Sequence, residues 1–215
     1  DEAADRYREI ITEFSSKQLE SEVYFWLLDY DRKKGNVENM QSVMAVFEKR
    51  PDTSDYPAQL AYFKAEERRL SQSYNEAIDW YEACILEHDT FVPEAYLGKG
   101  KALKAIGGYD SARLAFNNAL RFAKEEHALA VEARNGIAGV HFDADNYAEA
   151  AKAYLAIAIL YDDVDYVPPA LLKAGLSFEK MNENEKAIQA YEELVERFGK
   201  HPLASQAQLR LKQIK

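Results

Sequence analysis

The sequence is poor in the residues that mark a cross-linked or turn-rich protein. Cys84 is the single cysteine among 215 residues, so no disulfide forms within the chain and a zinc site built on several cysteines is excluded. Nine Gly and six Pro are too few for the many tight turns of an all-β sandwich or barrel. These shortages favour a helical protein.

Basic charge and long apolar runs are also scarce. Asp and Glu outnumber Lys and Arg by 37 to 27, which gives a net charge of −10. Such a surface repels phosphate backbones, so we expect no nucleic-acid partner. The longest apolar runs, such as residues 153–161, are far shorter than the roughly 20 residues that cross a bilayer. We therefore expect no membrane span.

What the chain does contain is enough apolar material for a folded core. Apolar residues make up 47% and aromatic residues 12% of the sequence, which excludes a disordered chain. The chain begins at Asp1 without an initiator Met or a charged-then-apolar leader. We expect it to be a processed product or a piece of a longer protein.

A triplet of residues spaced i, i+4 and i+7 recurs six times along the chain. Such a triplet forms one stripe of an amphipathic helix. From the N-terminus, the first members are separated by 37, 37, 35, 38 and 37 residues, a period typical of a solenoid of helix pairs. The copies are Ala3/Tyr7/Ile10, Met40/Met44/Phe47, Ala77/Tyr81/Cys84, Ala112/Phe116/Ala119, Ala150/Tyr154/Ile157 and Ala187/Tyr191/Leu194.

Proline and glycine follow the same period. Pro57, Pro93, Pro168 and Pro202 precede or open the first helix of a pair, where a missing N–H group is not needed. Gly35 and the pair Gly107-Gly108 lie between the first and second helices, where a left-handed backbone is common. The positions of proline and glycine therefore support the repeat period independently of the apolar triplets.

Together these patterns predict twelve helices. The ranges are 2–14, 20–33, 37–49, 57–71, 74–87, 93–106, 109–124, 128–142, 146–161, 168–181, 184–198 and 202–213. They make repeats at about 20–49, 57–87, 93–124, 128–161 and 168–198, with a lone helix before them and a C-terminal capping helix after them. We predict an all-α, right-handed α-solenoid of antiparallel helix pairs, with five full repeats and a half-repeat at each end, as a single domain over 1–215.

These repeats resemble the tetratricopeptide repeat family. The best copy runs from Pro93 to Leu120, with a large residue at Tyr96, a small residue at Gly100 and a second-helix triplet in the expected order. The segment from Pro168 to Leu194 matches the family pattern nearly as well. Other copies depart from the pattern: Leu28 replaces a small residue, and Asp31, Arg68 and His141 replace large apolar ones. The resemblance implies a protein-binding scaffold rather than an enzyme.

Signs of catalysis or of a cofactor are absent from the sequence. No two of the four histidines have the i, i+4 spacing of a helical metal site, and no phosphate-binding glycine loop or nucleophile elbow occurs. Two turns, at residues 141–145 and 161–165, carry several carboxylates, but hydration and helix capping explain them more simply than metal binding. Cys84 lies on an inward stripe, as a buried small residue does. We expect no catalytic residues, no metal and no cofactor.

In solenoids of this family the first helices line a concave groove, so the resemblance implies where a partner binds. The residues expected to face it include Asp29, Arg32, Glu66, Arg69, Leu97, Gly139, Leu172 and Leu176. The residues predicted to bind a partner are Phe25, Trp26, Tyr62, Phe63, Lys101, Lys104, Asn135 and Lys173. The lysines suit a carboxylate of an extended peptide; ordinary solvated lysines are the alternative. The aromatics suit interface anchors, or they fill the core.

The segment from Val167 to Pro202 is similar to repeats of bacterial envelope proteins, including the periplasmic Tol-Pal coordinator group and outer-membrane assembly lipoproteins. This similarity implies a scaffold for protein or peptide partners in the periplasm or cell envelope, with the cytoplasm as the alternative. Two other hypotheses remain. One is self-association through the N-terminal half-repeat, and the other is a role as the regulatory arm of a larger enzyme or signalling protein.

Overall fold

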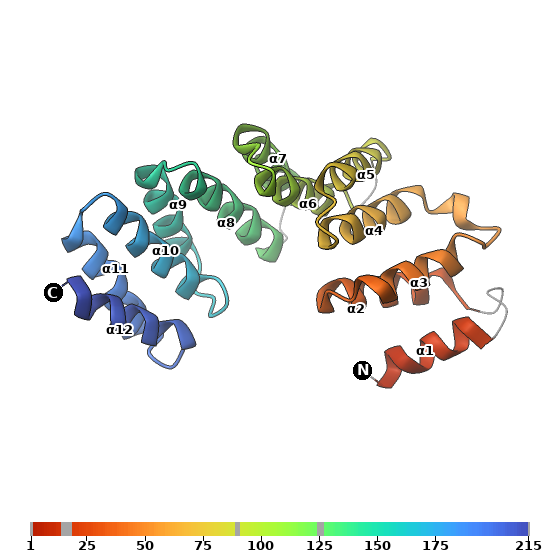
Figure 1. Cartoon of the computed structure of the whole chain (residues 1–215), viewed down its shortest axis with the longest axis horizontal. Coiled ribbons are helices and arrows are strands. Elements are labelled where there is room, and N and C mark those ends of the chain that lie inside the picture. Colours follow the sequence, from red (N-terminus) through yellow and green to blue (C-terminus); the bar gives the residue numbers. More distant parts are fainter. Residues whose placement is uncertain (1, 14–18, 89–90, 124–126, 215) are drawn as a thin grey trace. The chain divides into compact units, whose positions relative to one another are not determined.

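The computed structural model describes residues 2–13, 19–88, 91–123 and 127–214, which form helices and turns and include no strand. Contacts divide the chain into two compact units, residues 1–107 and 108–215, and each is described by itself. The prediction of an all-α solenoid of helix pairs is confirmed (Figure 1). A single domain over 1–215 stays a prediction.

The first unit holds six of the described helices. They are α1 (Glu2–Glu13), α2 (Ser21–Lys34), α3 (Val37–Phe47), α4 (Pro57–Leu70), α5 (Tyr74–Leu86) and α6 (Val92–Ala105), with a short 3₁₀ turn at Thr53–Asp55. Helices α2 and α3 pack as one pair and α4 and α5 as the next, and α6 packs on α5.

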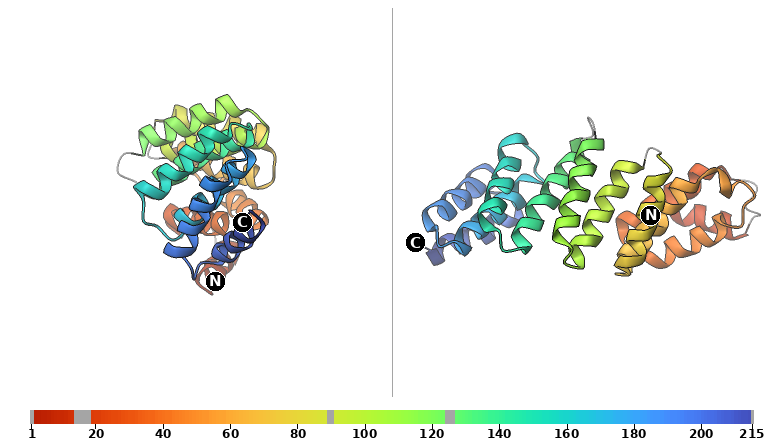
Figure 2. Two further views of the ribbon diagram at one scale, coloured as in Figure 1. Left: turned by 90° about the vertical axis from the view of Figure 1, so that its left-hand side faces the viewer. Right: turned by 90° about the horizontal axis from the view of Figure 1, so that it is seen from above.

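The second unit holds the other six described helices. They are α7 (Tyr109–Phe122), α8 (His127–Asp143), α9 (Tyr147–Leu160), α10 (Val167–Lys180), α11 (Asn184–Arg197) and α12 (Pro202–Ile214). Neighbours in the chain are again neighbours in space, α7 on α8, α8 on α9, α9 on α10 and so on to α12 (Figure 2). Every predicted helix is present, and the helix ends agree with the prediction to within two residues. The predicted ends at residues 14 and 124 lie outside the described residues.

The turn inside each helix pair uses one residue in the left-handed backbone region. These residues are Gly35, Gln72, Gly107, Asp145 and Asn182, with φ of 71°, 62°, 78°, 58° and 59°. They follow one another at the repeat period. The sequence pointed to the two glycines but not to the other three, because Asn and Asp tolerate this conformation without glycine and Gln gives no such signal.

The core of each pair is built on the aromatic residue of the second-helix triplet. Phe47, Tyr81, Phe116, Tyr154 and Tyr191 are all at most 4% exposed. Glycines admit these rings: a Cβ added at Gly98, Gly136 or Gly175 would lie 2.3–2.6 Å from a ring atom of Tyr81, Phe116 or Tyr191 respectively. Helices approach closely where the glycine stands.

The first copy departs from its predicted stripe. The sequence places Ala3, Tyr7 and Ile10 inward, but Ala4 and Ile11 are buried at 1% and 6% exposed, while Tyr7 is 37% exposed. The reason is an ion pair: Arg8 Nη2 lies 2.5 Å from Oδ1 of Asp31, which is fully buried on α2. Arg8 takes the place of the aromatic ring, and Asp31, where an apolar residue was expected, is its partner.

No helix among the described residues combines the length and the apolar character that a membrane crossing requires.

Candidate functional site

The predicted partner-binding residues all lie on first helices. Phe25 and Trp26 belong to α2, Tyr62 and Phe63 to α4, Lys101 and Lys104 to α6, Asn135 to α8 and Lys173 to α10. The first six are in the unit of residues 1–107, and the last two are in the unit of residues 108–215.

The four aromatics divide into core and surface. Tyr62 and Phe63 are buried, at 5% and 2% exposed. Phe25 is half-buried, with its ring centroid 5.0 Å from that of Phe47 and 6.0 Å from that of Phe63. These three rings fill the core, as the sequence allowed, and their part in partner binding stays a prediction. Trp26, by contrast, is 45% exposed.

Trp26 belongs to a small aromatic row on α1 and α2. Its ring centroid lies 5.7 Å from Tyr7, edge to face, and 5.6 Å from Tyr30, nearly parallel. Lys34 Nζ lies 5.7 Å from the centroid of Tyr30. Trp26 is therefore held in place by its neighbours while keeping an open face, as an interface anchor needs.

The predicted polar residues are accessible to different degrees. Lys101, Asn135 and Lys173 are exposed, and Lys104 is half-buried. Lys173 Nζ lies 4.7 Å from the centroid of the Phe142 ring, so a cation–π contact orients it. Their binding role stays a prediction.

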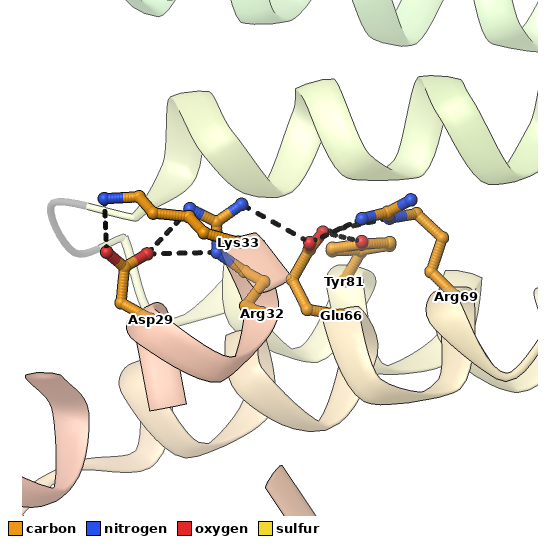
Figure 3. Close-up of polar contacts among 6 residues, drawn as sticks. All are labelled: Asp29, Arg32, Lys33, Glu66, Arg69 and Tyr81. Carbon is orange, nitrogen blue, oxygen red and sulfur yellow. Dashed lines mark hydrogen bonds and ion pairs between the residues drawn. The ribbon is translucent and has the colours of Figure 1, made fainter. Parts of the chain in front are cut away.

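The structure adds a feature that was not predicted as a site: a row of alternating charges across α2 and α4, closed by Tyr81 of α5 (Figure 3). We call it the charged row; its members are Lys33, Asp29, Arg32, Glu66, Arg69 and Tyr81. Four of them were expected to face the groove, but their pairing was not foreseen. The i, i+3 spacing of Asp29/Arg32 and Glu66/Arg69 was the available signal.

Ion pairs connect the charged row from end to end. Lys33 Nζ lies 2.6 Å from Asp29 Oδ2, and Arg32 Nη2 lies 2.7 Å from Asp29 Oδ1. Arg32 Nη1 then lies 3.7 Å from Glu66 Oε2, which joins α2 to α4. Arg69 donates from Nε and Nη2 to the two Glu66 oxygens at 3.2 and 2.7 Å. The Tyr81 hydroxyl donates to Glu66 Oε1.

Burial and charge act against each other on the pKa of Glu66. Burial by itself raises this pKa, but the hydrogen bond and charge of Arg69, together with Tyr81 and Arg32, outweigh it and lower the pKa below 4.5. Burial and the neighbouring Glu66 charge raise the pKa of Tyr81. Near neutral pH the carboxylate is therefore charged and the phenol is neutral.

Solvent meets mainly the cations of the charged row. The side chain of Glu66 is 4% exposed, while those of Arg32, Arg69 and Lys33 are 25%, 21% and 66% exposed. Asp29, at 37%, is the one accessible anion of the row. On a chain of net charge −10, this face is a local site for an anionic group.

Carboxylates of the two acidic turns accept hydrogen bonds from residues next to them in the sequence. Asp163 Oδ1 accepts hydrogen bonds from the backbone N–H groups of Asp165 and Tyr166 at 2.7 and 3.3 Å, just before α10. The Tyr147 hydroxyl donates to Asp145. Within the described ranges, no group of three or more His, Cys, Asp or Glu residues is placed to hold a metal. Cys84 is fully buried.

Sequence comparison finds a known repeat family in two segments of the chain. Residues 97–164 and residues 169–201 each match a family model of the tetratricopeptide repeat. A search of curated proteins found no match to this chain.

Solved structures share the fold. The chain is similar to BtubC from P. vanneervenii, with a TM-score of 0.71 and 12% identity over 91% of this chain and 88% of that one. It is similar to YrrB, described as a TPR protein with an unusual peptide-binding site, with a TM-score of 0.61 and 17% identity over 96% and 97%. It is also similar to a signal transduction ATPase of Pyrococcus horikoshii with a tetratricopeptide repeat sensor, with a TM-score of 0.75 and 15% identity over 98% and 36%.

Proposed function

We propose, from the premise that this chain is built of tetratricopeptide repeats, that it is a non-catalytic scaffold which binds other proteins. The fold itself suggests protein–protein interaction. Repeat solenoids offer extended surfaces rather than enclosed sites, which suits a binding role.

Within this role, the first-helix face of the unit of residues 1–107 binds an extended peptide that carries carboxylates beside an aromatic or apolar side chain. The main observation is the charged row, in which three partly exposed cations, Arg32, Arg69 and Lys33, outnumber one exposed anion, Asp29, although the chain is acidic. Arginine held in place by an ion pair loses little freedom when it binds a further carboxylate. Trp26 on the same helix supplies an apolar anchor. YrrB, with its described peptide-binding site, supports a peptide as the ligand.

Fluorescence anisotropy with labelled 12-residue peptides tests this proposal. One peptide set carries aromatic residues with Asp and Glu, a second replaces the acids by Asn and Gln, and a third replaces them by Lys. We expect only the acidic set to bind, and Lys33→Glu and Trp26→Ala each to weaken it at least tenfold, as loss of an interface anchor does. Binding should also weaken as salt rises.

Lys152→Glu is the matched control. Like Lys33, Lys152 is a largely exposed helical lysine beside an acidic residue, with 74% of its side chain exposed, but it lies in the other unit. Equal affinity of all three peptide sets, or undiminished binding by both Lys33→Glu and Trp26→Ala, would contradict the proposal. The double variant Lys101→Glu, Lys104→Glu tests whether the face extends onto α6.

A role as the sensor arm of a larger signalling protein is the second candidate. The likeness to the Pyrococcus horikoshii ATPase favours it, since the chain spans 36% of that protein, which has a tetratricopeptide repeat sensor. An antibody raised against this chain tests it on native cell extract. A polypeptide much larger than 24.5 kDa supports the candidate, and one of that size contradicts it.

Two further expectations are proposals. Self-association through the N-terminal half-repeat is supported by exposed Tyr7 and Trp26. It predicts that the mass measured by light scattering rises with protein concentration, and that Trp26→Ala lowers this mass.

A role in bacterial cell-envelope assembly rests on the resemblance of residues 167–202 to repeats of envelope proteins. Fractionation of cells into cytoplasm and envelope tests that location.

A further inference from the structure

The charged row holds an acid of its own on the cations that are proposed to bind the peptide. Asp29 Oδ1 accepts hydrogen bonds from Arg32 Nε at 3.0 Å and from Arg32 Nη2 at 2.7 Å, and Asp29 Oδ2 lies 2.6 Å from Lys33 Nζ. Figure 3 shows this side chain facing both of its partners. Asp29 therefore uses the two cations that α2 contributes to the row.

The two acids of the row differ in how firmly they are held. The side chain of Glu66 is 4% exposed, and it accepts hydrogen bonds from Arg69 of its own helix and from Tyr81 of α5. The side chain of Asp29 is 37% exposed. Among the described residues, its hydrogen bonds and ion pairs come only from Arg32 and Lys33 of its own helix. Glu66 is thus fixed by two helices, while Asp29 needs only a side-chain rotation to turn into solvent.

Displacing Asp29 costs little, but it is not free. Ion pairs between exposed side chains of one helix are weak, because water and salt screen them and both side chains lose freedom in forming them. Asp29 is nevertheless attached to α2, so its carboxylate is always present at a high effective concentration beside Arg32 and Lys33. A carboxylate that arrives from solution has to compete with it for the same N–H groups.

We infer that Asp29 is an internal competitor of the ligand: it occupies Arg32 and Lys33 in the free protein, and an acidic side chain of the bound peptide takes its place. This inference rests on the proposed function and adds a limit on the affinity of that same site. During the exchange Arg32 keeps its contact with Glu66, since Nη1 lies 3.7 Å from Oε2 on the buried side. The guanidinium therefore stays in place when Asp29 leaves.

Fluorescence anisotropy with the acidic 12-residue peptides measures this competition. Asp29→Asn keeps the size of the side chain and removes its charge. We expect this variant to bind the acidic peptides about threefold more tightly than the wild type does, a modest gain because the ion pairs removed are exposed ones. The gain should shrink as the salt concentration rises. If Asp29 instead held Arg32 in position for the ligand, the same substitution would weaken binding, so the sign of the change separates the two roles.

Glu149→Gln is the matched control. Glu149 is an exposed acid on α9, in the other unit, and it pairs with Lys152 three residues further along at 2.9 Å. Its replacement changes the net charge of the chain by the same one unit as Asp29→Asn does. We expect it to leave the affinity for the acidic peptides unchanged, so that a general effect of net charge is excluded.

Carbon-13 NMR of the side-chain carboxyl groups follows the displacement directly. Saturation of the wild type with an acidic peptide should shift the signal of Asp29 more than that of Glu66, because only Asp29 loses its partners.

The outcomes separate this inference from the proposed function. Equal or weaker binding of the acidic peptides by Asp29→Asn, an equal gain from Glu149→Gln, or an unshifted Asp29 signal at saturation overturns the inference, and leaves the proposed function intact as long as the wild type still prefers acidic peptides. If neither the wild type nor Asp29→Asn prefers the acidic peptides to those with Asn and Gln, the proposed function fails and the inference fails with it.

Discussion

At the scale of single residues, the structure shows how tightly the second-helix aromatics and the first-helix glycines depend on each other. The Tyr81 ring lies where a Cβ of residue 98 would stand, at 2.3 Å, and the Tyr191 ring lies in the same way against Gly175. Going back along the chain from Gly98 by one and two repeat periods leads to Phe63 and Trp26. At these earlier positions an aromatic stands where the later copy has a glycine.

Gly98→Ala should therefore destabilise the protein. Alanine is the better helix former by about 1 kcal/mol, but the clash with the buried Tyr81 ring should outweigh this, for a net loss of about 1–2 kcal/mol. Urea unfolding measures it. In a Tyr81→Leu background the same substitution should cost less, since the ring is absent. An equal loss in both backgrounds would show that the ring is not the cause.

Glu66 is the residue on which the charged row depends. Its replacement by Gln leaves Arg32 and Arg69 without their shared carboxylate. We expect a loss of about 3 kcal/mol in the free energy of unfolding, at the lower end for a broken buried pair because both arginines keep some exposure. Glu149→Gln, which removes an exposed carboxylate paired with Lys152, should leave the free energy of unfolding almost unchanged.

Glu66 should also affect how the free energy of unfolding depends on pH. Because its pKa is lower in the folded than in the unfolded chain, it stabilises the folded chain above the unfolded pKa, and this contribution is lost as the pH falls through the lower, folded value. Urea unfolding at several pH values from 6 to 3 should thus show a smaller acid loss for Glu66→Gln than for the wild type. Identical slopes would mean that folding does not shift the pKa of Glu66.

At the scale of elements, two of the departures from the repeat pattern, Asp31 and Arg68, form ion pairs. Asp31 meets Arg8 of α1, and Asn39 Nδ2 of α3 donates to the same Asp31 oxygen at 3.4 Å. Arg68, another charged residue at an expected apolar position, lies 3.2 Å from Glu76 and 3.4 Å from Glu67. Ion pairs between neighbouring helices thus replace apolar contacts in the first unit, and these helices recognise each other by charge as well as by shape.

Arg8 should accordingly hold α1 in place. Arg8→Met keeps much of the side-chain length but leaves Asp31, which is fully buried, without its cation. Hydrogen exchange should then show faster exchange in α1 and near Asp31, since an unpaired buried carboxylate is costly. The double variant Arg8→Met, Asp31→Leu should recover much of the protection. Slower or unchanged exchange in the single variant would rule out the proposed role.

At the scale of the whole molecule, each of the two units is a series of contacts between neighbouring helices. Each helix packs mainly on the helices next to it in sequence, and the contacts fall into units of residues 1–107 and 108–215. In such a series a local change is felt mostly by adjacent repeats. The proposed peptide face lies in the unit of residues 1–107.

Gly175→Ala tests this locality. Its Cβ meets the Tyr191 ring, so amide protection measured by hydrogen exchange should fall in α10 and α11 and stay the same in α2 and α4. A loss spread evenly over both units would instead support the prediction of one domain over 1–215, unfolding as a single body.

The helices and their order were determined by the sequence, because a helix is specified locally: apolar spacing sets its face, proline its start and a left-handed residue its end. Only the tertiary structure decided which residues of one face are covered. Trp26 and Phe63 occupy equivalent positions one repeat apart, yet Trp26 is 45% exposed and Phe63 is 2% exposed. Burial depends on neighbours distant in sequence. For the same reason Glu66, one of 37 acids, became recognisable only when α2 and α5 brought Arg32 and Tyr81 to it.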